Sequence, residues 1–155
     1  MALNETLNQI LSNGTDMRTS GTTGTSKLIY QSIDKIQAAN SVARNVQNIN
    51  SNSRILTVCT LDHVGGLFAQ TLPGHEVGAH IHTELFNAYS WVRQISDYTH
   101  SHLTPNMARA VMKTRSFTEL NLAGITVMVG SDRVHTSIIN SFLDQSATFI
   151  TNWGM

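Results

Sequence analysis

The chain has 155 residues, which is enough for one ordinary domain with a buried core. Apolar residues make up 41% of it and charged residues 13%, and ten basic residues balance ten acidic ones, so the formal net charge is zero. This balance provides no basic surface to attract nucleic acid or an anionic membrane. It also provides little electrostatic repulsion between copies, so homodimerisation is one expectation.

The sequence also bears on where the protein is found. Its start lacks the basic region followed by an apolar one that marks a signal peptide. No apolar run approaches the roughly 20 residues of a membrane-spanning helix. The single cysteine, Cys59, cannot form an internal disulfide and lies in the apolar run 55–59, where a small hydrophobic residue is expected rather than a nucleophile. We therefore expect a cytoplasmic protein.

The first third of the chain places helix and strand signals around a long polar loop. In chain order, the predicted elements are a helix over 3–11, a loop over 13–26, a strand over 27–31, a helix over 33–48 and a strand over 54–60. Ser32 is a good N-cap for the second helix. The loop holds three glycines and many hydroxyl groups. A loop of this length inside a domain is usually functional or disordered.

Strands and helices alternate through the rest of the chain. The remaining predicted elements are a helical turn over 67–72 that Pro73-Gly74 ends, strands over 76–82, 100–103, 125–129 and 147–151, and helices over 87–98, 104–113 and 131–143. Thr104-Pro105 should start one helix, and Ser131 or Asp132 should cap another. The alternation predicts an α/β fold with a mostly parallel sheet flanked by helices. We expect residues 1–14 to form a helix and linker, and 15–155 to form one domain.

The most informative segment runs from Thr19 to Lys27. Glycines allow a backbone to approach a ligand closely, and successive N–H groups can form a concave anion site. The hydroxyls and Lys27 add donors for phosphate oxygens. The spacing fits neither the Walker loop nor a dinucleotide fingerprint. On composition alone, the segment is either a polyphosphate-binding loop or a flexible linker.

This segment, T-S-G-T-T-G-x-x-K, resembles the signature phosphate loop of the adenylate-forming superfamily, whose form is T-S-G-T-T-G-x-P-K. Only the proline differs, and Ser26 replaces it. Members of this superfamily include acyl-CoA synthetases, luciferases and peptide-synthetase adenylation domains. The chain is most similar in character to the o-succinylbenzoate–CoA ligases. The resemblance implies ATP or AMP as the ligand.

Three further segments resemble family motifs in the same order. His63 lies in a segment similar to the family's aromatic-His-x-x-Gly motif, with Asp62 where an aromatic residue is usual. Residues 129–132 resemble a Gly-Gly-Ala/Glu segment, with Val129 at the first glycine. Residues 152–155 resemble the start of a Tyr-Gly-x-Thr-Glu segment, with Trp153 at the tyrosine. Together the matches cover roughly residues 15–155.

The resemblance implies a role for each matched residue. Thr19, Ser20, Thr22, Thr23 and Lys27 would bind the β- and γ-phosphates of ATP. Gly21 and Gly24 would shape the loop. His63 would lie near the reacting carboxylate, so His63 and Lys27 are the candidate catalytic residues. Gly130, Ser131 and Asp132 would border the acyl-adenylate, and Trp153 and Gly154 would border the adenine.

The family pattern also continues beyond the residues present here. Mg²⁺, a carboxylic acid and CoA are the further ligands of an intact enzyme, and its Mg²⁺-placing Glu, ribose-binding Asp and C-terminal lysine have no match in this chain. We therefore expect a ligase fragment with weak or no catalysis alone. The alternatives are a non-catalytic nucleotide- or anion-binding module, or an oligomeric or metal-binding protein. Two histidine pairs, His80/His82 and His100/His102, could hold zinc, but hydrogen-bonded histidines are the more common outcome, and we predict no metal site.

Overall fold

A computed structural model describes residues 2–18 and 27–152. Its main sheet has five parallel strands in the spatial order β4-β3-β5-β6-β7. These strands are β3 (Arg54–Thr57), β4 (His80–Thr83), β5 (His100–Leu103), β6 (Thr126–Gly130) and β7 (Thr148–Asn152). A separate antiparallel hairpin pairs β1 (Thr15–Arg18) with β2 (Leu28–Gln31). The predicted α/β fold with a mostly parallel sheet is confirmed.

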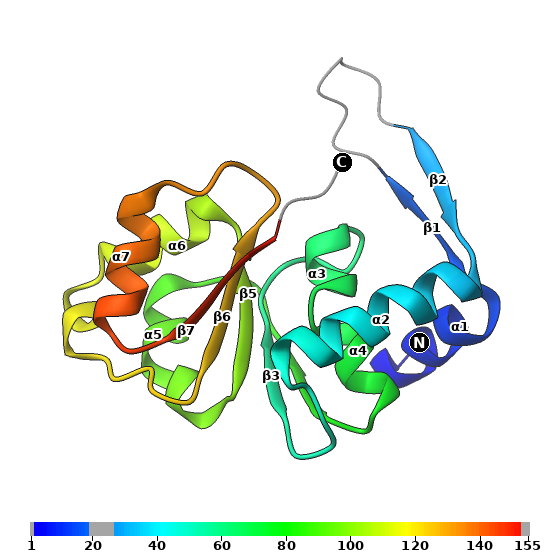
Figure 1. The fold of residues 1–155 in the computed structure, drawn as a ribbon, viewed down its shortest axis with the longest axis horizontal. Coiled ribbons are helices and arrows are strands. Elements are labelled where there is room, and N and C mark those ends of the chain that lie inside the picture. The colour runs from blue at the N-terminus through cyan, green and yellow to red at the C-terminus, as the bar shows by residue number, and fades with distance from the viewer. Residues whose placement is uncertain (1, 19–26, 153–155) are drawn as a thin grey trace.

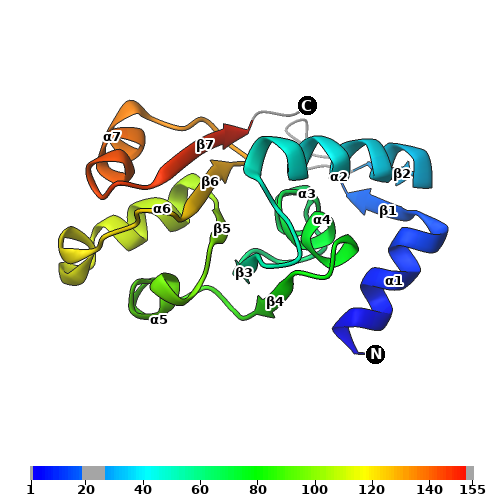
Figure 2. The same ribbon diagram turned by 60° about the horizontal axis from the view of Figure 1, so that its bottom comes forward.

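Helices cover both faces of the main sheet, as Figures 1 and 2 show. One face carries α2 (Ile33–Gln47), α3 (Val64–Phe68) and α4 (Thr71–Glu76), and α1 (Leu3–Asn13) packs on α2 and α4. The other carries α5 (Ala88–Gln94), α6 (Pro105–Met112) and α7 (Thr136–Asp144), with short 3₁₀ turns η1 (Ile95–Asp97) and η2 (Arg115–Glu119). The connection from β3 leads to β4 on one side, and the chain then crosses to β5 on the other. The gap between β3 and β5 is therefore the switch point of the sheet, where ligands bind in such folds.

The larger core lies under α5, α6 and α7. Trp91 is fully buried there, and its ring meets that of Phe142 edge-on at 6.2 Å. The Trp91 indole N–H donates a 2.9 Å hydrogen bond to the Ser101 hydroxyl, which donates in turn to the Leu56 carbonyl. These hydrogen bonds connect α5 to β5 and β3, and each buried polar atom that takes part in them has a partner.

A smaller core joins the first four helices. Leu7 of α1 is fully buried against Ile36, Leu67 and Leu72. The N-terminal helix is therefore an integral part of the packed structure. No helix in the described ranges is long and apolar enough to cross a membrane.

Three predicted helix starts are confirmed by their caps. The Ser32 hydroxyl accepts from the Lys35 N–H, and the Thr104 hydroxyl accepts from the Met107 N–H ahead of Pro105 at the first helical turn. The Asn87 side chain caps α5 in the same manner. These side chains satisfy backbone donors that have no partner within the helix.

Several predicted boundaries are wrong. Residues 15–18 form a strand within the expected loop, because β2 provides a pairing partner. β3 ends at Thr57, so Cys59 lies beyond the strand. Pro73-Gly74 lies inside α4 instead of ending a helix, and β4 starts only at His80. Pro73 is tolerated because it falls in the first turn, where its missing N–H would have no acceptor.

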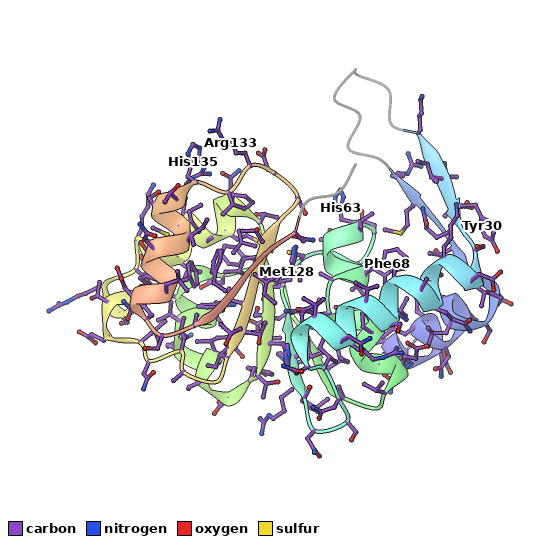
Figure 3. All side chains as sticks on the ribbon, in the orientation of Figure 1. Tyr30, His63, Phe68, Met128, Arg133 and His135 are labelled. Carbon is purple, nitrogen blue, oxygen red and sulfur yellow. The ribbon has the colours of Figure 1, made fainter. Side chains whose placement is uncertain are left out.

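The predicted cap of the last helix is also wrong. α7 starts at Thr136 with His135 at the N-cap position, and neither Ser131 nor Asp132 caps it. Ser131 instead has a left-handed backbone (φ 76°) that turns the chain sharply away from β6. Figure 3 shows Arg133 and His135 on the resulting loop between β6 and α7.

Candidate functional site

The candidate site lies at the carboxyl ends of the parallel strands, where α3 begins. His63 is exposed at the N-cap position of α3, and Figure 3 shows it at the end of this helix. Its backbone carbonyl accepts the first helical hydrogen bond, from Leu67, and its side chain caps nothing. The imidazole is thus available to a ligand. A hydrogen bond from the Thr60 side chain, aided by the charge of His63, lowers the pKa of the exposed Asp62 carboxyl.

Glycines bring α3 into contact with the sheet. A β-carbon on Gly65 would lie 2.6 Å from His102 Cε1 and 2.8 Å from Ser131 Oγ, and one on Gly66 would overlap the Thr60 carbonyl. Both positions therefore require glycine for close approach. As a result, the turn that carries His63 packs directly on the ends of β5 and β6. No motif in the sequence indicated this role for Gly65.

The neighbour of Gly130 on β7 leaves no room for a side chain at position 130. The Asn152 side-chain oxygen occupies the position that a β-carbon on Gly130 would take. Ser131 follows with its hydroxyl beside Gly65, so one of the predicted acyl-adenylate residues meets the His63 turn. Asp132 behaves differently: it is exposed, and its carboxylate accepts a 2.6 Å hydrogen bond from the Arg133 N–H.

A buried polar group lies directly beneath these residues. Cys59 Sγ is 3.4 Å from His102 Nδ1 and 3.7 Å from Met107 Sδ. Burial raises the pKa of the Cys59 thiol to about 11, although a backbone hydrogen bond at Thr104 opposes the shift. Burial also lowers the pKa of His102 to about 4, against a smaller effect of the Asn152 side chain. Both groups are neutral at pH 7, and Cys59 does not have the thiolate character of a nucleophile.

The gap around this group admits no ligand. It is enclosed by residues of β3, its following loop, α3, α4 and β5, and it has no room even for a water molecule. Its lining residues are Thr57, Val58, Cys59, Gly66, Gln70, Thr71 and His102. Any ligand must therefore bind above it, at the level of His63 and Ser131.

The predicted phosphate loop connects the two strands of the hairpin. Arg18 pairs with Leu28, so the hairpin holds the two ends of this segment next to each other. Figure 1 shows this end of the hairpin pointing to the same side of the molecule as the carboxyl ends of the main sheet. Lys27 directly precedes β2 and is exposed. The predicted residues Thr19, Ser20, Gly21, Thr22, Thr23, Gly24, Trp153 and Gly154 lie outside the described residues.

The base of the hairpin is fixed to α1. The Tyr30 hydroxyl donates a 2.6 Å hydrogen bond to the Asn13 carbonyl, and Figure 3 shows Tyr30 on the hairpin. Gly14 lies beside the same hydroxyl with φ 74° and has no room for a side chain. The hairpin is therefore anchored where it leaves the helical layer.

The two histidine pairs have separate hydrogen-bonding partners. His82 lies 3.4 Å from the Glu84 carboxylate and stacks on Tyr98, and His80 is exposed. His100 Nε2 contacts the Gln47 carbonyl at 2.9 Å, and burial lowers its pKa. Within residues 2–18 and 27–152, no group of three or more His, Cys, Asp or Glu side chains is placed to hold a metal ion.

Comparisons with known proteins bear on the family and the fold. The model of the family "AMP-binding enzyme" matches residues 17–155. No curated protein matches the chain. Among solved structures, an acyl-CoA synthetase (AMP-forming)/AMP-acid ligase II-like protein from Dyadobacter fermentans is similar with a TM-score of 0.81 at 15% identity, over 97% of this chain and 44% of that one.

Two further structures carry informative ligands. ATP-bound MatB from Rhodopseudomonas palustris has a TM-score of 0.80 at 14% identity, over 90% of this chain and 28% of its own. The anthranilate CoA ligase AuaEII in complex with anthranoyl-AMP has a TM-score of 0.77 at 18% identity, again over 90% and 28%. The chain thus spans less than half the length of each solved relative. Since the family model covers almost all of its sequence, the chain belongs to the AMP-binding, adenylate-forming enzymes.

Proposed function

We propose that this chain forms the phosphate-binding loop and one wall of the acyl-adenylate site in an ATP-dependent, carboxylate-activating ligase. The observation that carries the proposal is the hairpin, which holds the ends of the T-S-G-T-T-G segment together on the side of the molecule where His63 lies (Figure 3). The family match and the fold shared with an ATP-bound relative support it.

In the proposed reaction, a carboxylate oxygen attacks the α-phosphorus of ATP, an acyl-phosphate bond forms, and pyrophosphate leaves. The work of the protein is mainly to position the reactants and to stabilise developing negative charge. The hydroxyls of Thr19, Ser20, Thr22 and Thr23 and the Lys27 ammonium would donate to the β- and γ-phosphates, with Gly21 and Gly24 allowing close backbone approach. CoA would then displace AMP from the acyl group.

The other wall residues have separate proposed roles. His63 would donate a hydrogen bond to the reacting carboxyl group, because its ring is exposed at the carboxyl ends of the strands, above the gap that has no room for a ligand. Gly130, Ser131 and Asp132 would border the acyl-adenylate, and Trp153 and Gly154 the adenine. Mg²⁺ is proposed for the intact enzyme only, since the described part of the chain offers no cluster of carboxylates to hold it. The chain alone would then bind nucleotide with little or no turnover.

Calorimetry of ATP and AMP, with and without Mg²⁺, tests the proposal. The wild-type chain should bind ATP saturably, and Thr23→Ala/Lys27→Ala should lose that binding while keeping its melting temperature. Arg109→Ala provides a matched control, because this partly exposed cation lies on α6, outside the candidate site, and donates a hydrogen bond to Asn106. Equal affinity in the double variant and the wild type would refute the phosphate-loop role.

A second proposal concerns self-association. Val42 and Val46 are 62% and 59% exposed on one side of α2, and Leu28, Ile29 and Tyr30 are exposed on β2. Together with the zero net charge, these apolar surfaces favour a homodimer. Light scattering at micromolar concentration should give twice the monomer mass, and Val42→Lys/Val46→Lys should restore the monomer. A monomeric wild type would refute it.

A further inference from the structure

Two buried polar atoms at the candidate site form no hydrogen bond of ordinary geometry, although the Asn152 side chain is near enough to His102 to oppose the lowering of its pKa. They are His102 Nε2 on β5 and Asn152 Oδ1 at the end of β7. The other two such atoms in the described ranges, Asn40 Oδ1 and Gln70 Oε1, belong to the packed helices on one face of the sheet. Leaving a buried donor or acceptor unpaired is costly, so such atoms are rare in native proteins. Two of them on strands that are separated only by β6 therefore require an explanation.

One tautomer of the imidazole pairs it with both of its neighbours. Cys59 has a protonated thiol whose S–H can donate to His102 Nδ1 at 3.4 Å, to the His102 carbonyl at 3.5 Å or to Met107 Sδ at 3.7 Å. We assign the thiol proton to the contact with Nδ1, the shortest of the three. The imidazole is neutral because it is buried, so its single proton must then lie on Nε2. Asn152 Oδ1 can only accept. The two unpaired atoms are therefore a donor and an acceptor that match each other.

The sheet register gives them a route to each other. β6 lies between β5 and β7, with Met128 beside His102 and Gly130 beside Asn152. Because residue 130 has no side chain, Asn152 can extend over β6 toward His102. His102 Nε2 is buried away from solvent, and the gap that His102 helps to line has no room for water. Asn152 is the remaining partner.

We propose that His102 is a positioning residue for the nucleotide site: held by Cys59, it fixes Asn152 and thereby the point where the chain leaves β7 toward Trp153. The role rests on the proposed function, because Trp153 is the proposed adenine contact. The ring reaches the ligand only through Asn152 and is not a catalytic residue. From the sequence, His102 was a candidate zinc ligand only, and Asn152 had no predicted role of its own.

The tautomer can be tested without any ligand. Nitrogen NMR of the wild-type chain at pH 7 should show His102 neutral with its proton on Nε2, and that proton should exchange slowly with water. Asn152→Ala should increase its exchange rate by at least about tenfold, the factor that corresponds to a hydrogen bond of ordinary strength. A proton on Nδ1, or an exchange rate that Asn152→Ala leaves unchanged, would overturn the proposal.

The positioning role is tested by comparing nucleotide with tripolyphosphate. His102→Leu should weaken AMP binding by about three- to tenfold, the effect of one lost hydrogen bond, and leave tripolyphosphate binding unchanged. His102→Gln, which can place an amide N–H near the Nε2 position, should restore much of the affinity. His102→Leu should have no further effect in an Asn152→Ala chain. His100→Leu is the matched control, because it removes a buried histidine on the same strand and face that contacts Gln47 instead.

The outcomes separate the two proposals. If the wild-type chain binds neither AMP nor tripolyphosphate, the proposed function fails, and Trp153 fluorescence then decides the positioning role. The chain has two tryptophans, so Trp91→Phe leaves Trp153 as the reporter. In that background, His102→Leu should shift the emission and its quenching by acrylamide, whereas His100→Leu should not. Equal effects of His102→Leu and His100→Leu would overturn the positioning role.

Discussion

The side-chain oxygen of Asn152 lies where a β-carbon of Gly130 would be, so these two residues on neighbouring parallel strands share one volume. A glycine on β6 and a polar side chain on β7 are therefore a matched pair. Neither residue can be changed to a larger one without moving the other, and both border the candidate site.

Gly130→Ala should lower the free energy of unfolding by about 1–3 kcal/mol, as overpacking of a filled site typically does. Denaturant titration measures the loss. Adding Asn152→Gly to Gly130→Ala should recover most of it, because the volume is freed. Gly124→Ala is the comparison, since its β-carbon would meet nothing and only its φ of 80° opposes the change. An additive double variant would contradict the shared volume.

Gly65→Ala separates helix propensity from packing. Alanine is favoured over glycine inside a helix by about 1 kcal/mol. In α3, however, the new methyl group would lie 2.6 Å from His102 Cε1 and 2.8 Å from Ser131 Oγ. We expect packing to win, with a lower melting temperature and weaker AMP binding. A more stable Gly65→Ala chain would show that α3 moves away from the sheet at little cost.

His102 should make stability depend on pH. The unfolded chain protonates this imidazole near pH 6.5, whereas burial lowers the pKa in the folded chain to about 4. Since the unfolded state binds the proton first, the free energy of unfolding should be highest above pH 6.5 and fall between pH 6.5 and 4. The loss should be on the order of 3 kcal/mol.

Denaturant titrations at several pH values measure this loss, and His102→Gln should flatten the curve over the same window. His100, whose pKa is also lowered by burial, contributes in the same direction, so His100→Gln shows how much of the slope belongs to each ring. Parallel curves for the wild type and His102→Gln would contradict the prediction.

Tyr30→Phe should weaken ATP binding without affecting global stability much. It removes the 2.6 Å hydrogen bond to the Asn13 carbonyl that anchors the hairpin to α1. Because Tyr30 is 55% exposed, the stability loss should be below about 1 kcal/mol. Calorimetry would measure the affinity. Tyr89→Phe, on the exposed side of α5, should leave both quantities unchanged, and an unchanged affinity in Tyr30→Phe would argue against a link between the hairpin and the phosphate loop.

Local signals predicted much of the fold. Ser32, Asn87 and Thr104 cap helices through contacts with residues three positions away, so a short stretch of sequence contains the whole interaction. Alternating strands and helices likewise predicted the parallel sheet. Serine is a common capping residue, but Ser131 has a left-handed backbone instead. It lies where β6 meets β7 and α3, and the local sequence does not encode that packing.

The candidate site was only partly predictable for the same reason. His63, Gly130 and Ser131 could be predicted as site residues because they lie in motifs that are contiguous along the chain. Cys59, His102 and Asn152 come from three separate segments, and their contacts depend on the strand order β3-β5-β6-β7. The spacing of His100 and His102 correctly predicted that they share one face of a strand. It could not predict which helix or strand end each of them meets.

β5 has all four of its residues buried, with a strand on each edge. Amide protons in such a strand exchange with solvent only when most of the molecule unfolds, whereas exposed hairpins and short terminal helices open more often. By this rule we expect β5, which carries His102, to open among the last segments, and the hairpin to rearrange more easily around a ligand. Hydrogen exchange should therefore show binding as increased protection in the hairpin and at the start of α3, with β5 already at its limit.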